Sequence, residues 1–255
     1  MKKPAWVIEK ERGRRAAAEQ TVWLFGLHAV RDALLNPARE RLRLIVTRNA
    51  ADKLADAIAE AGMTPEIADA RRFPAPLDPG SVHQGAALEV RPLDWGGIEA
   101  IIADPAPILL LDRVSDPHNA GAVLRSAEVF GAAAVIAPAR HSAPETGALA
   151  KAASGALERQ PYLRVRNLSV AMASLREAGR ELLGLAGDAE TTLEQGLSAA
   201  GGAPVGLVLG AEGPGLRPGT RSACTRLVRI PAAGRFGSLN VSNAAAVSLY
   251  AAARR

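Results

Sequence analysis

The chain has 255 residues, 48% of them hydrophobic, and its 31 Lys and Arg against 26 Asp and Glu give a formal net charge of +5. A chain of this length can bury one substantial core and a smaller second one, so we expect two domains. The basic balance favours polyanionic partners, nucleic acid foremost. Cys224 is the only cysteine, which excludes an intramolecular disulfide and a cysteine-rich zinc site. No uncharged apolar stretch reaches the roughly 18 residues of a membrane-spanning helix.

Residues 1–20 are predicted to form a basic, flexible arm, because Lys and Arg outnumber the acidic residues there. A solvated tail without function and an arm that grips phosphates both fit this composition. Charged residues interrupt the stretch where a secretory signal would need an apolar run. We therefore expect the protein to stay in the cytoplasm.

After the arm, short strand-like runs alternate with helical ones, for example Leu42–Val46 followed by the amphipathic Lys53–Ala61. This alternation predicts a small α/β domain at 21–94. Residues 95–106 concentrate Pro and Gly and are predicted to be a linker. A second domain is expected at 107–255.

The second domain contains buried-type apolar runs of strand length, separated by helix-like segments. These runs are Ile108–Leu111, Ala133–Ala137, Leu182–Leu185, Gly206–Leu209 and Leu227–Ile230. The pattern predicts a mostly parallel sheet with helices on both faces, whose ligands bind at the carboxyl ends of the strands. An Ala-rich helix is predicted from Ser238 to Arg255.

A first motif, LDRVSDPHNAGAVLR at 111–125, follows the first of these strands. Asp116-Pro117 ends the strand, and Asn119 is predicted to be the N-cap of a helix that has Arg125 in its second turn. Inside a regular helix the two side chains would point about 120° apart, so they converge on one site only if Asn119 lies at the loop end. A plain cap and a surface arginine are the alternative interpretation.

A second motif, GLVLGAEGPGL at 206–216, places three glycines and the carboxylate of Glu212 after another strand. Glycines let a backbone approach a ligand closely, although a plain tight turn has the same pattern. The glycine order is neither the dinucleotide fingerprint nor a Walker A motif, which argues against a nicotinamide dehydrogenase.

A third motif, RIPAAGRFGSLNVS at 229–242, combines a strand, a loop and a polar helix entry. Ser238, Asn240 and Ser242 are expected near backbone N–H donors. Capping explains any one of them, but it does not explain three such turns after strands of one domain.

The three motifs together resemble the SpoU (TrmH-like) branch of the SPOUT RNA 2′-O-methyltransferases. The resemblance lies in DPHN at 116–119 with Gly121 and Arg125, in LGAEGPG at 209–215, and in Ile230-Pro231 followed by SLNVS at 238–242. FGLHAV at 25–30 and VHQG at 82–85 are similar to the amino-terminal domain of the 23S rRNA guanosine 2′-O-methyltransferases. Small departures from that subgroup are Ala232, Gly237 and Asn243.

The resemblance implies an α/β fold: a C-terminal SPOUT-type sheet domain with a trefoil knot, preceded by a small L30e-like α/β domain that binds the RNA substrate. It also implies a homodimer, without metal, whose site is completed across the subunit interface. The activity it implies is transfer of a methyl group from S-adenosyl-L-methionine to a ribose 2′-hydroxyl in RNA, with a guanosine of 23S ribosomal RNA as the expected target.

The family's functional positions carry over residue by residue. The cofactor-binding positions are Gly210, Ile230 and Leu239, and the catalytic positions are Asn119, Arg125, Glu212, Ser238 and Asn240. In this scheme Arg125 and a substrate phosphate organise the attacking hydroxyl, since a guanidinium keeps its proton.

Two rivals stay open at this point. One is a sibling enzyme that methylates transfer RNA or another ribosomal nucleotide. The other is a non-catalytic RNA-binding protein of the same fold, which would be expected to lack Arg125, Glu212 or Asn240, and all three are present.

Overall fold

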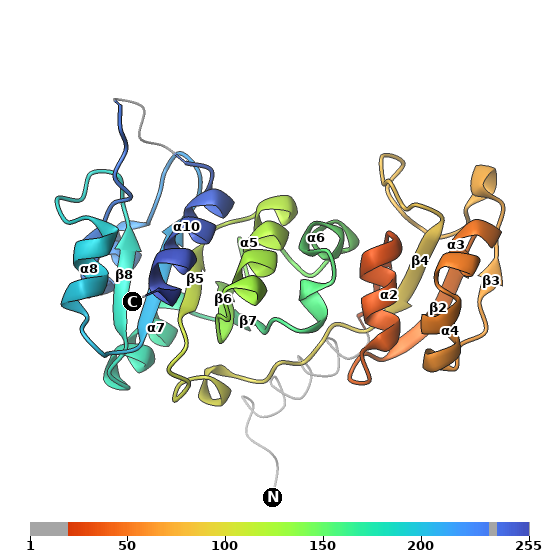
Figure 1. Ribbon diagram of the computed structural model, residues 1–255, viewed down its shortest axis with the longest axis horizontal. Coiled ribbons are helices and arrows are strands. Elements are labelled where there is room, and N and C mark those ends of the chain that lie inside the picture. The colour runs from red at the N-terminus through yellow and green to blue at the C-terminus, as the bar shows by residue number, and fades with distance from the viewer. Residues whose placement is uncertain (1–19, 235–238, 255) are drawn as a thin grey trace, which may run out of the picture. The chain divides into compact units, whose positions relative to one another are not determined.

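The computed structural model describes residues 20–234 and 239–254. The chain divides into two compact units (Figure 1). The first unit extends to Asp94 and includes Glu145–Gly147, and the second comprises Trp95–Pro144 and the chain from Ala148 onward. Apart from Gln20, the predicted basic arm lies outside the described residues.

The first unit contains a four-stranded sheet in the order β1-β4-β2-β3. Its strands are β1 (Val22–Phe25), β2 (Arg41–Val46), β3 (Glu66–Ile67) and β4 (Ala86–Val90). Its helices are α2 (Leu27–Leu35), α3 (Arg48–Lys53) and α4 (Ala55–Ala61). Strand β4 pairs antiparallel with both β1 and β2, and β3 pairs parallel with β2.

The strand predicted at Leu42–Val46 is confirmed as β2, and the helical run predicted at Lys53–Ala61 is confirmed as α4 except for its first two residues. Lys53 instead ends α3, and a new helix starts at Ala55. Leu54 leaves the helical conformation, with φ −106° and ψ 7°, and its side chain is buried. The helix therefore starts two residues later than predicted.

The second unit contains a six-stranded sheet in the order β10-β8-β9-β5-β6-β7, in which all neighbouring strands are parallel. Its strands are β5 (Ile108–Asp112), β6 (Ala134–Pro138), β7 (Tyr162–Val165), β8 (Glu181–Leu185), β9 (Val205–Gly210) and β10 (Arg226–Val228). Its helices are α5 (Pro117–Val129), α6 (Gly147–Ala153), α7 (Leu168–Glu177), α8 (Leu193–Ala199), α9 (Pro218–Ala223) and α10 (Val241–Ala253).

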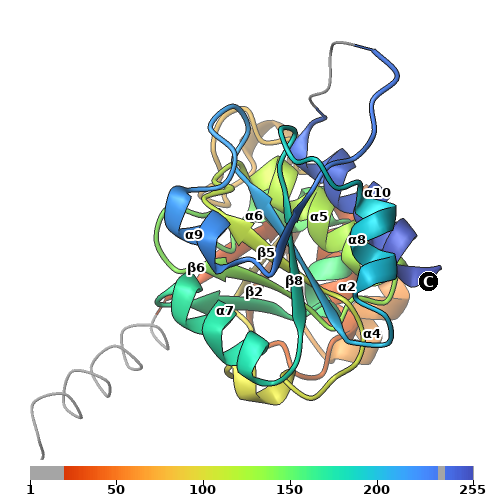
Figure 2. The same cartoon turned by 90° about the vertical axis from the view of Figure 1, so that its left-hand side faces the viewer.

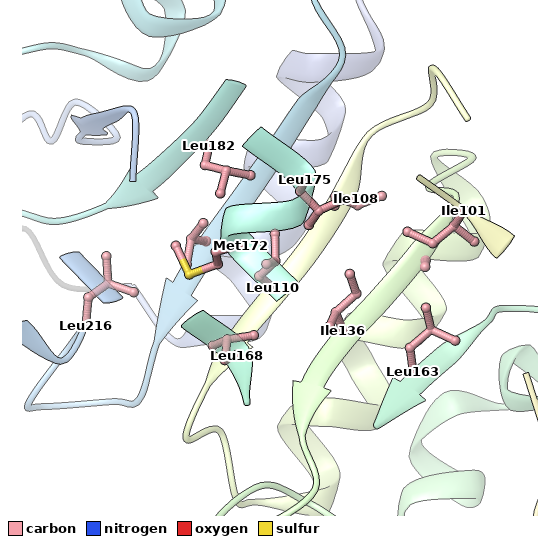
Figure 3. Packing of buried hydrophobic residues seen from close by; sticks show 12 residues of the cluster. Ile101, Ile108, Leu110, Ile136, Leu163, Leu168, Met172, Leu175, Leu182 and Leu216 are labelled. Atoms are coloured by element: carbon pink, nitrogen blue, oxygen red, sulfur yellow. The ribbon is translucent and has the colours of Figure 1, made fainter. Parts of the chain in front are cut away.

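Helices cover both faces of this sheet, as predicted: α7 and α9 on one side, and α5, α8 and α10 on the other (Figure 2). Every residue of β5 and β6 is buried, as expected for central parallel strands. Because side chains alternate between faces, Leu110 and Ile136 point to the same side as Met172 and Leu175 of α7 and pack with them in one apolar cluster (Figure 3).

The sequence interpretation missed the edge strand β7, whose short apolar run contains Arg164. It also overestimated two lengths. Strand β10 ends at Val228 rather than Ile230, and the last helix starts at Val241 rather than Ser238. The latter start is set by Asn240, whose side chain accepts a hydrogen bond from the Ser242 N–H and caps the helix.

The segment predicted as a linker, 95–106, lies against the second unit. Ile101 is buried in the apolar cluster of Figure 3, and Trp95, Ile98 and Ile102 pack on it. Across residues 20–234 and 239–254, no helix is long and apolar enough to cross a membrane.

Candidate functional site

The first motif enters α5 differently from the prediction. Asp116, not Asn119, is the N-cap, since its carboxylate accepts a hydrogen bond of 2.9 Å from the His118 N–H. Pro117 occupies the first helical position, where its missing N–H costs nothing. Asn119 is therefore the third residue of the helix, and Arg125 falls in its third turn instead of its second.

Three side chains from the three motifs meet at the carboxyl edge of the parallel sheet, and we call them the polar cluster: Asn119, Glu212 and Asn240. Asn119 Nδ2 donates to Glu212 Oε1 at 3.1 Å, and Asn240 Nδ2 donates to Asn119 Oδ1 at 2.9 Å. Asn240 Nδ2 also donates to Glu212 Oε1. Asn119 is thus joined in one hydrogen-bonded ring to two residues that lie more than 90 positions further along the chain.

The polar cluster also fixes the start of the last helix. The Val241 N–H points to Glu212 Oε1 at 3.4 Å, while Asn240 Oδ1 caps the same helix through the Ser242 N–H. Glu212 Oε2 has no hydrogen-bond partner among the described residues. One carboxylate oxygen therefore holds the cluster together, and the other can accept a hydrogen bond from a ligand.

Arg125 does not join the polar cluster. Its side chain is exposed, and within residues 20–234 and 239–254 it makes no hydrogen bond or ion pair. Since Asn119 and Arg125 both lie inside α5, six helical residues turn them about 120° apart. One chain alone does not bring these two predicted residues together. Ser238 lies outside the described residues.

A cavity of about 700 Å³ adjoins the polar cluster and has Glu212 in its wall. All three predicted cofactor positions, Gly210, Ile230 and Leu239, line it. The remaining lining comes from the ends of β8 and β9 and the loops after them, from Arg221 of α9, from the segment after β10 and from the start of α10. This volume lies within the range of about 300–1,000 Å³ typical of small-molecule sites.

Gly210 has a structural reason to be glycine besides contact with a ligand. A Cβ atom at this position would lie 2.1 Å from the carbonyl carbon of Gly215. The loop folds back on itself here, and the Gly215 N–H donates to the Ala211 carbonyl at 2.9 Å. The second motif therefore needs Gly210 to close the loop that forms the cavity wall.

Gly121 of the first motif likewise allows close packing. An added Cβ would lie 2.6 Å from both the Ala152 Cβ and the Leu149 carbonyl oxygen of α6. This glycine positions α5, and with it Asn119, against its neighbour.

The sequence interpretation missed two charged residues of the cavity wall, Asp188 and Arg221. Arg221 Nη2 lies 2.7 Å from Asp188 Oδ2, and this hydrogen bond lowers the pKa of the Asp188 carboxyl below its ordinary value. The only available signal was that Asp188 follows the apolar run Leu182–Leu185, because loops after parallel strands build ligand sites.

The lining suits S-adenosylmethionine, which combines an apolar adenine ring with a ribose and a positively charged sulfur. Leucine and isoleucine side chains, among them Leu185, Leu209 and Ile230, offer an apolar surface for the ring. Glu212 and Asp188 add carboxylates that can face hydroxyls or positive charge. Among the described residues, no group of His, Cys, Asp and Glu side chains could hold a metal ion.

Comparison with known families matches residues 106–250 to the model of the SpoU rRNA methylase family. The chain is 38% identical over 242 residues to the 23S rRNA (guanosine-2′-O-)-methyltransferase RlmB of Escherichia coli strain K12, covering 91% of this chain and 98% of that protein. Identity to the protein of the same name from Salmonella typhimurium is 39%, with the same coverage.

Solved structures share the fold over both units. The SpoU methyltransferase AviRb from Streptomyces viridochromogenes superposes with a TM-score of 0.76 at 25% identity, covering 94% of this chain and 90% of AviRb. Its complex with the cofactor AdoMet superposes with the same TM-score at 24% identity, covering 95% and 92% of the two chains.

Proposed function

The chain belongs to the SpoU rRNA methylase family, and from this premise we propose that it transfers a methyl group from S-adenosylmethionine to the ribose 2′-hydroxyl of a guanosine in 23S ribosomal RNA. The observation that carries the proposal is the convergence of Asn119, Glu212 and Asn240 beside a cavity of suitable size. Relatives that share 38% identity across 98% of their length carry this activity in their name.

Within this function, Gly210, Ile230 and Leu239 hold the cofactor, since all three line the cavity. The cofactor supplies a methyl group bound to a positively charged sulfur. The protein's task is then to hold the ribose hydroxyl in line with that group and to manage its proton, which together can provide a large part of the rate enhancement.

The polar cluster is suited to orient the ribose. Glu212 Oε2 can accept a hydrogen bond, and Asn119 Nδ2 keeps one N–H beyond the one it donates to Glu212. A donor and an acceptor side by side match the hydroxyls of a ribose. Asn240 holds both partners in place, and Ser238 is proposed to assist at the transferring end of the cofactor.

Arg125 is proposed to act in the site of a partner subunit in a homodimer. It shares a face of α5 with Val129, four residues further on, whose side chain is 70% exposed. Helix α10, which packs against α5, adds Val247 and Tyr250 at 43% and 50% exposure. Covering this apolar surface by a second copy is favourable, and it would bring Arg125 to a polar cluster that its own chain does not offer it.

We further propose that the C-terminal segment forms a trefoil knot. In support, Arg229 bridges to Thr192 just beyond β10, at the edge of the sheet, whereas α10 packs on α5 and β9 nearer its centre. The segment between Arg229 and α10 therefore connects two separate places on the sheet.

Residues 21–94 are proposed as an L30e-like RNA-binding domain, 95–106 as the linker and 107–255 as the catalytic domain. In the first unit, Phe73 and His83 stack with ring centroids 4.1 Å apart, next to the exposed Arg71 and Arg72. Unpaired RNA bases stack on aromatic rings and on guanidinium groups, and this part of the chain offers both. With ribosomal RNA as substrate, we expect the protein to act in the cytoplasm.

The decisive test is to map 2′-O-methylated nucleotides in cellular RNA with and without the gene, followed by methylation of the mapped RNA by the purified protein with labelled cofactor. We expect one guanosine of 23S RNA to lose its methyl group and the purified enzyme to restore it in the presence of EDTA. If the methyl group is lost from transfer RNA or from another ribosomal nucleotide, that nucleotide is the substrate and the proposed guanosine is not.

A further inference from the structure

A second cavity, of about 510 Å³, shares part of the loop 211–216 with the cavity proposed for the cofactor. Its wall is basic: three of its nine lining residues are Arg or His, and none is Asp or Glu. The four polar residues of this wall are Arg113, Ser115, His141 and Arg217.

These residues sit at the same edge of the sheet as the polar cluster. Arg113 directly follows β5, His141 lies in the loop after β6, and the shared loop follows β9. The three strands are parallel neighbours in the order β9-β5-β6. The second cavity therefore occupies the place where open parallel sheets bind ligands.

Both Arg113 and His141 adopt a left-handed backbone conformation, with φ values of 63° and 62°. Residues with a Cβ rarely do so, although Asn, Asp and His adopt it more readily than the others. The fold thus presents an arginine and a histidine side chain from this unusual conformation in the wall of one cavity, and the strain falls on Arg113. Such strain persists only where the surrounding structure enforces it, and it concentrates at functional sites.

The loop that carries His141 is braced by hydrogen bonds. The Ala143 N–H donates to the Val114 carbonyl at 3.0 Å, which ties this loop to the one that carries Arg113. Arg164 donates to the carbonyls of Ala143 and Ala139 at 2.6 and 2.9 Å. The side chains of Arg113 and His141 are therefore displayed from a rigid support.

Arg217 is oriented by Asp112, a carboxylate with no solvent exposure. Asp112 Oδ1 accepts from Arg217 Nε at 2.7 Å and Oδ2 accepts from the Arg217 N–H at 3.0 Å. The Arg217 side chain is still 47% exposed. One side of its guanidinium is held by the protein, and Nη1 has no partner among the described residues.

The other donors of this cavity are free as well. Within the part of the chain that the structure describes, the side chains of Arg113, Ser115 and His141 make no hydrogen bond and no ion pair. Four side chains thus offer hydrogen-bond donors to one cavity. No acidic side chain lines it, although the buried Asp112 behind Arg217 balances the charge of that one arginine. Arginine and hydroxyl donors grouped in this way match the oxygens of a phosphate.

We propose that this second cavity binds a backbone phosphate of the RNA substrate beside the nucleotide that is methylated. The proposal rests on the proposed function, because RNA is the anion that this enzyme must hold against its cofactor cavity. The shared loop explains the arrangement: it carries Glu212 of the polar cluster and also forms a wall of the phosphate site. The cofactor also carries a carboxylate, but Arg221 and Arg229 line the larger cavity and can bind it there.

The test uses the full-length double variant Arg113→Asn/His141→Asn. Asparagine tolerates the left-handed conformation, so the loops keep their shape while the arginine and histidine side chains are lost. Arg140→Asn is the matched control, because Arg140 is an exposed arginine in the same loop that does not line the cavity. Arg217 is left unchanged, since its loss would strand the buried Asp112 carboxylate.

Dissociation constants are measured by filter binding of a 23S rRNA transcript at several salt concentrations, and by calorimetry for S-adenosylmethionine. We expect the double variant to bind RNA at least about tenfold more weakly, with a salt dependence reduced by about one phosphate contact. Cofactor affinity should stay within about twofold of the native value. The Arg140→Asn variant should match the native protein in both.

Native RNA affinity and native salt dependence in the double variant would overturn the phosphate site. A selective loss of cofactor affinity would overturn it too, by assigning the cavity to the cofactor. If Arg113→Asn disturbs folding, Arg113→Gly removes the charge and the backbone strain together, and an RNA affinity equal to native in that variant is again contrary to the proposal. If the native enzyme fails to methylate 23S RNA while these variants still lose RNA affinity, the proposed function fails and the phosphate site stands.

Discussion

The polar cluster and the exposed face of α5 each contain a residue of the first motif. They differ in whether that residue finds side-chain partners within one chain. In the polar cluster, Asn119 finds its partners Glu212 and Asn240 within one chain. On the α5 face, Arg125 lies beside the exposed Val129 and has no ion pair among the described residues. This difference is the basis for our proposal that a single chain builds the part of the site that holds the cofactor and ribose, and that a second copy supplies the part that acts on the hydroxyl.

Among the variants that test this comparison, Arg125→Ala should have the largest effect on activity. We expect methyl transfer to fall by at least about 100-fold, because the hydroxyl loses its activating group, while cofactor affinity changes little. Arg125→Lys should recover little activity, since lysine lacks the planar fork that can hold a phosphate and a hydroxyl together. Single-turnover methylation and a separate cofactor titration measure the two effects. Near-normal turnover of Arg125→Ala would show that Arg125 is a surface arginine without a role in methyl transfer.

Mixing two inactive variants, Arg125→Ala and Asn240→Ala, separates the two halves of the site. If Arg125 acts in the partner's site, each mixed dimer contains one intact site, so an equal mixture should regain roughly a quarter of native activity. Activity is measured after the subunits have been dissociated and reassociated together. If Arg125 acts within its own chain, no mixed dimer is complete and the mixture stays inactive.

Val129→Glu should weaken the dimer interface proposed at the exposed face of α5. Burying a carboxylate in an apolar interface costs at least about 2 kcal/mol, which weakens dimerisation roughly 30-fold. Sedimentation or light scattering over a dilution series measures this shift, and activity should fall with the dimer. Val170→Glu is the control, because Val170 is 61% exposed on α7, on the other side of the sheet. Equal effects of the two variants would place the interface elsewhere.

Gly210→Ala should damage the cofactor half of the site. The added Cβ would overlap the Gly215 backbone, and overpacking of this kind costs about 1–3 kcal/mol. We expect a lower melting temperature and weaker cofactor binding. Gly187→Ala is the matched control, because Gly187 lines the same cavity and a Cβ there would meet nothing within 4 Å. Similar losses in both variants would contradict the role of loop closure.

Glu212→Gln is expected to have the smallest effect. The glutamine oxygen can still accept the hydrogen bonds of the polar cluster, but an NH₂ group replaces the carboxylate oxygen that can accept from the ligand. Loss of that charge-assisted hydrogen bond costs about 1 kcal/mol and thus roughly a fivefold loss of affinity. Calorimetry with S-adenosylmethionine measures the loss. Glu190→Gln, in the loop after β8 but outside the cavity wall, removes the same charge as a control. Native affinity in Glu212→Gln would show that the carboxylate charge is not needed.

Much of this site could be predicted because its signals are local. Apolar runs predicted four strands of the parallel sheet closely, and polar residues just after them pointed to its carboxyl edge, where Asn119, Glu212 and Asn240 do meet. Strand β7 escaped prediction because Arg164 interrupts its apolar run. Asp116 displaced Asn119 as helix cap because an Asp followed by Pro offers the stronger helix start.

The sequence by itself determined the fold class, the family and the residue types of the site, because these depend on side-chain period and on short motifs. Only the tertiary structure decided which of those residues meet. It separated Arg125 from the polar cluster, paired Asp188 with Arg221 in the cavity wall, and grouped Arg113 with His141 and Arg217 in a second cavity. The reason is physical: strand order and the closure of loops bring together side chains from distant segments, and the order in which parallel strands pair is not written in any local pattern.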